Sequence, residues 1–354
     1  MNEVMKERLK RIAPKVGYPL FYLFSLVVFL SWTFPYEKLK ERIVTTFNAQ
    51  QRTSSAPTEL QIDELDSSWL TGVKAKGVRL ISPSADPTKA PIEIKIDEAR
   101  ARISLLGLLV GNRDVSFRID AFDGTIKGSF DDSGKERNVD VTFDGVDMSK
   151  IDAIAANVGF PLEGKLFGNL KLQLPEGKAS KANGTVALEI RDMVAGNSKE
   201  LMVKTPLGPF TLPPLKVGTF AVNGDAKEGI LKITKVGASG SDVDVTGDGR
   251  VQLREVATDA HLEVNLKFKL NDGYRTKNDK TKMLFGAPGV KDKPMLEMDP
   301  RMAKAKSADG FYALRIGGTL AKPDPQPGGG SVAVPGFGAS PSGTVAVPGG
   351  FNFK

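Results

Sequence analysis

The sequence predicts a mainly β protein. One N-terminal transmembrane helix precedes a long, curled antiparallel meander sheet, shaped as a trough or half-barrel, with one short internal helix. Three observations predict this fold class. Residues 16–36 carry no charge, apolar and polar residues alternate along much of residues 58–322, and glycine recurs both in turns and inside the alternating runs.

The uncharged segment at residues 16–36 is long enough to cross a bilayer, because about 20 helical residues span the ~30 Å hydrocarbon core. The side chains expected to anchor it are Val16, Leu20, Leu23, Leu26, Leu30 and Phe34. Residues 1–15 carry five basic and two acidic side chains, which predicts a cytoplasmic N-terminus and export of everything after Tyr36. A cleaved signal peptide is the alternative. It would need small residues where this segment has the bulky run from Trp32 to Tyr36, so we favour an uncleaved, single-pass anchor.

Residues 37–57 follow the anchor and contain an amphipathic helix. Leu39, Ile43 and Phe47 recur at a spacing of four residues among charged neighbours. Two interpretations remain open for this helix. It lies on the membrane surface, or it covers the open end of the sheet that follows.

Residues 58–322 form the β domain. The clearest strand pattern is at 261–270, where alternate residues are apolar and the residues between them are polar. This alternation predicts a dry inner face and a wet outer face. The inner-face residues that we single out are Leu166, Leu170, Leu172, Val264, Leu266 and Phe268. Helical spacing from Ser149 to Val158 predicts the internal helix, and the prolines of Gly208–Pro214 predict a loop.

Glycine supports both the turns and the curvature of this domain. Asx-Gly pairs favour tight hairpins. These pairs are Asp123-Gly124, Asp144-Gly145, Asn183-Gly184, Asn223-Gly224, Asp248-Gly249, Asp272-Gly273 and Asp309-Gly310. Glycines also fall on the apolar face of the runs at 162–174, 243–253 and 312–320, where they allow a sheet to bend. A long sheet with an apolar face and regular bends is expected to fold over itself as a trough.

The net charge of +7 comes from two short segments, residues 1–15 and 271–306. The rest is balanced and no nucleic-acid module is recognisable, so we expect no nucleic-acid partner. The basic stretch 275–306 is either a solvated loop or a contact for anionic lipid headgroups. Residues 323–354 contain six prolines and eight glycines, which predicts a disordered tail.

No chemistry-bearing constellation is evident. We expect no catalytic residue, no cofactor and no metal site, and therefore not an enzyme. His261 is the only histidine and lies on the polar side of its strand. The run from Asp242 to Gly247 resembles the start of a calcium loop, but Leu253 stands where a bidentate glutamate is required.

Four glycine-punctuated stretches carry a family resemblance. They are RISLLGLLVGNRDVSFRIDAFDGTIKGSF at Arg102–Phe130, GFPLEGKLFGNLKLQL at Gly159–Leu174, GASGSDVDVTGDGRVQL at Gly237–Leu253 and GFYALRIGGTLAKPDPQP at Gly310–Pro327. Together with the N-terminal anchor, their order resembles the AsmA-like superfamily and, within it, the family of general secretion pathway protein N of the type II secretion system. The proline- and glycine-rich tail is extra to that pattern.

The resemblance implies a bacterial inner-membrane protein with its bulk in the periplasm. It implies a role in protein secretion across the outer membrane, with other secretion-system subunits as partners. The alternative within the superfamily is a lipid-handling protein for outer-membrane homeostasis, with phospholipid in the sheet groove. A groove lined with apolar side chains would favour lipid handling, whereas a groove packed shut, with exposed sheet edges, would favour a scaffold.

Overall fold

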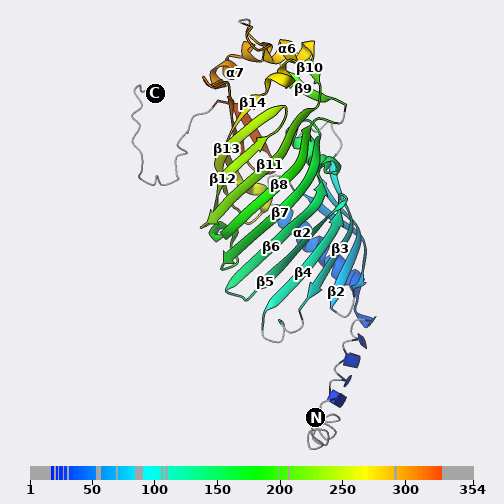
Figure 1. Ribbon diagram of the computed structural model, residues 1–354. Helices are drawn as coiled ribbons and strands as arrows, with labels where there is room; N and C mark the ends of the chain where they lie inside the picture. Colours follow the sequence, from blue (N-terminus) through cyan, green and yellow to red (C-terminus); the bar gives the residue numbers. More distant parts are fainter. Residues whose placement is uncertain are drawn as a thin grey trace, which may run out of the picture.

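The computed structural model describes residues 17–328, except 20, 23, 27, 30–31, 53–56, 69–70, 84–90, 105–106, 108–110, 198, 206–207 and 291–292. One antiparallel sheet of 14 strands dominates the described part, and its strands lie side by side in chain order (Figure 1). A separate hairpin, β9 with β10, interrupts the order between β8 and β11. The predicted mainly β antiparallel meander is confirmed.

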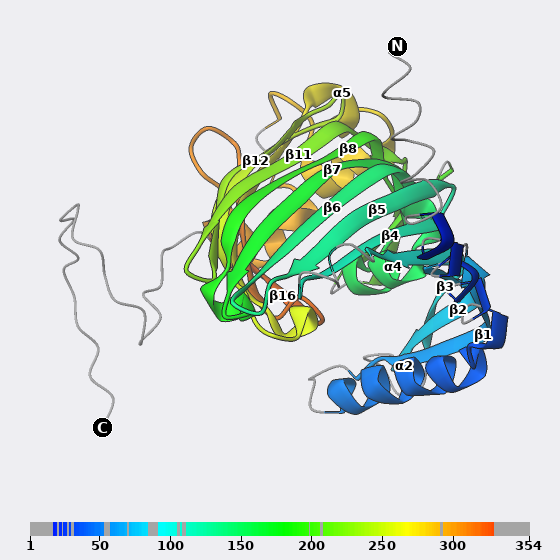
Figure 2. The same cartoon turned by 90° about the horizontal axis from the view of Figure 1, so that it is seen from below.

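The first half of the large sheet consists of β1 (Glu59–Ser68), β2 (Gly72–Ser82), β3 (Ile92–Ile103), β4 (Arg113–Ala121), β5 (Gly124–Asp132), β6 (Glu136–Asp147), β7 (Leu162–Pro175) and β8 (Asn183–Ala195). The second half consists of β11 (Leu215–Lys227), β12 (Ile230–Ser239), β13 (Val243–Gln252), β14 (His261–Leu270), β15 (Tyr312–Gly318) and β16 (Pro323–Pro327). The sheet does not close, because β1 and β16 each pair with one neighbour only. It curves into an open arc (Figure 2).

Glycine contributes to this curvature in two ways. Four of the Asx-Gly pairs expected at turns lie inside strands instead: Asp144-Gly145 in β6, Asn223-Gly224 in β11, Asp248-Gly249 in β13 and Asn183-Gly184 at the start of β8. At the first two the register shifts, so each pair marks a β-bulge that bends its strand. At Gly249 a Cβ atom would lie 2.4 Å from the carbonyl oxygen of Glu263, so glycine permits the close approach of β13 and β14.

Helix α2 (Tyr36–Gln51) packs against β1–β3 on the concave side of the arc (Figure 2). Its apolar side chains Leu39, Ile43 and Phe47 contact the buried cluster that includes Leu60 and Leu65. Of the two interpretations of this helix, the structure therefore favours the one in which it covers the sheet. The apolar face is used within the protein.

Short helices and the β9–β10 hairpin form a cap over one end of the strands, at the top of the molecule in Figure 1. The cap consists of β9 (Leu201–Thr205), β10 (Gly208–Leu212), α5 (Asp272–Arg275), α6 (Asp279–Phe285), η4 (Met295–Met298) and α7 (Pro300–Ala305). Two expectations are corrected here. The segment predicted as a proline-rich loop is largely strand β10, which pairs only with β9 and leaves its other edge free of ladder bonds. The basic stretch 275–306 contains helices, so the expectation of one internal helix, met by α4 (Asp152–Val158), was too low.

The composition of residues 323–327 predicts that they belong to a disordered tail, but they form edge strand β16. The amide of Gly328 donates to the carbonyl of Ala313 at 3.0 Å, so alternate residues from 328 backwards point their amides at β15. Pro323, Pro325 and Pro327 have the opposite parity. Their missing N–H groups therefore fall on the free edge, where no ladder bond is lost. The rest of the predicted tail, from residue 329, lies outside the described residues.

The predicted anchor lies partly outside the described residues, since Val16, Leu20, Leu23 and Leu30 are not described. Leu26 and Phe34 are described and are 53% and 46% exposed. In the described part of the chain, no helix combines the length and apolar character needed to cross a bilayer. The single-pass anchor stays a prediction.

Candidate functional site

One apolar row crosses the inner face of the sheet from β4 to β16. Residues paired across neighbouring strands share a face, so the register traces the row directly. Its members are Ile119, Ile126, Phe143, Gly168, Leu188, Val222, Val236, Gly247, Leu266, Leu314 and Pro327. The row passes through every strand of the large sheet after β3, and all its members are apolar residues, glycine or proline.

The structure brings the predicted inner-face residues onto this same face. Leu266 belongs to the row itself. Leu170 and Val264 lie in the adjacent row, linked through Val186, Gly224, Ile233 and Gly249. Leu166 and Phe268 lie in the row on the opposite flank, linked through Ile190, Phe220, Ala238 and Val245. Leu172 continues the pattern through Gly184 and Ala226.

The outer face is polar along the same strands. Between the apolar positions stand charged pairs, including Arg118–Asp120, Lys171–Asp140 and Arg191–Glu189. Such exposed pairs contribute only about 0–1 kcal/mol each, so they add little stability. Their position shows instead which face of the sheet meets water. The two faces are thus chemically distinct over most of the sheet.

Coverage of the inner face differs along the sheet. At β1–β3 it is covered by α2, and at the cap end by a buried cluster that includes Leu162, Val217 and Leu284. Between these ends lie Ile119, Ile126, Phe143, Leu170 and Leu188 on β4–β8. All five are half-buried, and none belongs to a buried cluster of the described residues. The middle of the inner face therefore presents apolar side chains that the described chain leaves partly uncovered.

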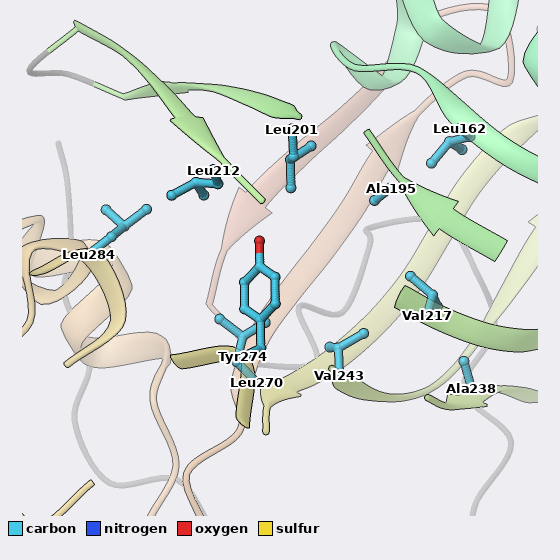
Figure 3. Close-up of a cluster of buried hydrophobic side chains, with 10 residues drawn as sticks. All are labelled: Leu162, Ala195, Leu201, Leu212, Val217, Ala238, Val243, Leu270, Tyr274 and Leu284. Atoms are coloured by element: carbon cyan, nitrogen blue, oxygen red, sulfur yellow. The ribbon is translucent and has the colours of Figure 1, made fainter. Parts of the chain in front are cut away.

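Tyr274 lies in the buried hydrophobic cluster at the cap end (Figure 3), and polar contacts around it join the cap to the sheet. Tyr274 of α5 is 1% exposed, and its hydroxyl donates to the carbonyl of Pro213 at 2.7 Å. Burial raises the pKa of the Tyr274 hydroxyl, so it stays protonated and remains a donor. Asp242 accepts from the amide of Lys216 at 2.9 Å and pairs with Lys277 at 3.5 Å.

Asp242 opens the run that resembles the start of a calcium loop. Its side chain is mostly buried and joins β11 to the cap. Its alternation with Val243 and Asp244 gave no signal of burial, because a carboxylate that bonds a neighbouring backbone amide looks like any turn aspartate in sequence. Its partners, Lys216 and Lys277, are far apart in sequence.

Reactive groups are not assembled on this surface. His261 begins β14 and is exposed on the polar side of the strand. Among the described residues, no three histidine, aspartate or glutamate side chains are grouped so as to hold a metal ion. The inner face offers apolar contact area, which suits binding of an extended apolar ligand.

Comparison of the chain with protein-family models, with curated proteins and with solved structures found no match.

Proposed function

We propose that the protein is a non-enzymatic, membrane-anchored lipid-binding protein of the bacterial envelope. Its concave sheet face binds the acyl chain of a phospholipid. The observation that carries this proposal is the partly uncovered apolar surface on β4–β8, with Ile126, Phe143 and Leu170 at its centre.

Hydration of apolar surface is unfavourable by about 25 cal/mol per Å². A contiguous apolar patch that a protein leaves uncovered therefore commonly marks a binding surface. Acyl chains suit this one, because an extended hydrocarbon needs contact along its length and no hydrogen-bond partner. The inner rows supply that contact across neighbouring strands, and they contain no charged side chain between Ile119 and Leu266.

The sheet edges support ligand binding over strand addition. A scaffold that recruits partners by pairing strands needs a free edge with open donors and acceptors. On β1 the Asn48 side chain accepts from the amide of Leu60 at 2.8 Å and donates to its carbonyl at 3.3 Å. Lys40 donates to the carbonyl of Asp63 at 3.1 Å. The opposite edge, β16, carries prolines at its outward positions.

Site-specific photocrosslinking tests the proposal. A benzophenone amino acid replaces Leu170, which faces inward, or Lys171, which faces outward one residue along. The full-length protein is illuminated in cells whose phospholipids carry radioactive phosphate. We expect label on the protein modified at position 170 and background label at position 171.

Two outcomes would overturn the proposal. Equal label at both positions would show that lipid contact does not follow the inner face. A crosslink from position 170 to a protein, seen as a large shift on a gel, would show that a polypeptide occupies the surface. Leu170→Gln serves as a further check, because a polar side chain should reduce lipid that co-purifies with the protein.

The resemblance to the secretion family also predicts a role in type II secretion, with other subunits of that system as partners. A gene deletion separates the two roles. Loss of lipid handling should admit dyes that an intact outer membrane excludes, while secretion continues. Secretion substrates stranded in the periplasm, with unchanged permeability, would support the secretion role instead.

A further inference from the structure

The cap concentrates exposed apolar side chains. Beyond residue 35, the large apolar side chains that are clearly exposed in the described chain are Ile103, Val158, Met202, Met283, Val290, Met298 and Leu320. Four of these belong to the cap or its connecting loop. They are Met202 at 49%, Met283 at 51%, Val290 at 55% and Met298 at 67% exposure. The other three lie outside the cap: Ile103 ends β3, Val158 ends α4 and Leu320 follows β15.

The same region is basic. Residues 271–306 carry nine basic and five acidic side chains. The acidic groups at 272, 279, 297 and 299 are paired with cap cations. Lys280, Lys293 and Lys304 are exposed and form no ion pair with another described residue. The surplus positive charge is therefore available to an external partner.

Local geometry places the two kinds of side chain together. In α6 the buried residues are Thr281 and Leu284, which fix the side of the helix that faces the protein. Lys280 and Met283 are three residues apart, so they neighbour each other on the exposed side. Hairpin β9–β10 adjoins α6 at the top of the molecule in Figure 1, and Lys280 and Thr211 line one shared depression.

We propose that this cap is a docking surface for an anionic lipid bilayer. Lysines attract anionic headgroups within about one Debye length, roughly 10 Å at 0.1 M salt. The exposed methionine side chains of the cap enter the boundary between headgroups and acyl chains. A soluble acidic protein would match the charge, but it gives no reason for four apolar side chains to stand exposed in the same cap.

The docking surface is independent of lipid binding on the inner face. It also lies far from the described residues that precede α2: these dark blue residues are at the opposite end of the molecule from α6 and α7 (Figure 1). A bilayer that holds the N-terminal segment therefore leaves the cap accessible to a second lipid surface. This separation makes a direct test feasible.

Vesicle flotation tests the proposal with the full-length protein in nanodiscs of neutral phosphatidylcholine. These are mixed with vesicles of phosphatidylcholine alone or with added phosphatidylglycerol. We expect capture by the anionic vesicles only, with affinity falling as salt rises. The triple variant Lys280→Gln, Lys293→Gln and Lys304→Gln should lower that affinity by about 100-fold. Met202→Ser combined with Met283→Ser should lower it by about tenfold.

A matched control keeps the test specific. Lys127→Gln, Lys232→Gln and Lys235→Gln remove the same charge from exposed positions on the outer face of the sheet. This variant should bind anionic vesicles within about twofold of the parent protein. Equal capture by neutral vesicles, or equal losses in the cap and control variants, would overturn the proposal.

Discussion

The covered end of the sheet and its middle are built from the same kind of strand, but their inner-face side chains are buried to different extents. At the cap end, Tyr274, Leu284 and the β9–β10 hairpin pack on the apolar side chains of β11–β14 and bury them. On β4–β8 the inner face has equally apolar side chains, such as Phe143 and Leu170, yet they are only half-buried. The comparison separates two properties of a strand. Alternation decides which side chains share a face, and elements distant in sequence decide whether that face is covered.

The largest expected effect tests whether the alternation defines a dry face at all. Leu266→Asp puts a carboxylate among the side chains packed on Val236 and Val264. An unpaired charge there should lower the free energy of unfolding by about 3 kcal/mol. Lys267→Asp points to water one residue along and should change it by about 0.5 kcal/mol or less. Urea denaturation followed by circular dichroism measures both free energies. Equal losses of stability in the two variants would show that the alternation does not define a buried face.

Local sequence signals account for how much of this fold was predictable. The period of two is a property of each strand alone, so the meander and the common face of Leu170 and Leu266 follow from sequence. The cap does not. Its helices α5 and α7 span only four and six residues, too short for a helical period to stand out, and the large apolar residues of α6 are consecutive, at 283–285, so they show no helical spacing. Two of these helices carry start signals in the sequence: Asn278 forms a capping box with Thr281 at α6, and Pro300 follows the N-cap Asp299 at α7.

The candidate site was predictable in part for the same reason. The inner-face residues came from alternation, and the outer-face position of His261 came with them. Alternation could not predict which part of the inner face is covered, because that depends on where α2 and the cap pack. The buried role of Asp242 also depends on Lys216 and Lys277, which the sequence does not place near it.

A matched pair of leucines sharpens the contrast between the covered end and the middle. Leu284 in the cap is 3% exposed, so Leu284→Ala should leave a cavity and lower the free energy of unfolding by about 3 kcal/mol. Leu170 in the middle is half-buried, and Leu170→Ala should cost about 1 kcal/mol or less. Urea denaturation of the full-length variants without added lipid is the measurement. Equal losses would mean that the middle is as tightly covered as the cap end.

The smallest expected effect concerns an ion pair that joins the cap to β15. The apolar inner rows of β4–β8 contain no such ion pair. Glu297 accepts from the Tyr312 hydroxyl at 2.8 Å and pairs with Lys306 at 2.6 Å. Burial alone would raise the pKa of Glu297, but hydrogen bonds from Lys306 and Tyr312 outweigh it and hold that pKa below its usual value. A carboxylate whose pKa is lower in the folded state stabilises the fold above its unfolded pKa, about 4.3, and that contribution is lost as pH falls through the folded value. Glu297→Gln should therefore lower the free energy of unfolding by about 1 kcal/mol at pH 7, with the difference shrinking as the pH falls below about 4. Paired urea titrations of the parent and variant at pH 7 and pH 3.5 measure this, and a difference that grows on acidification would contradict the assigned direction.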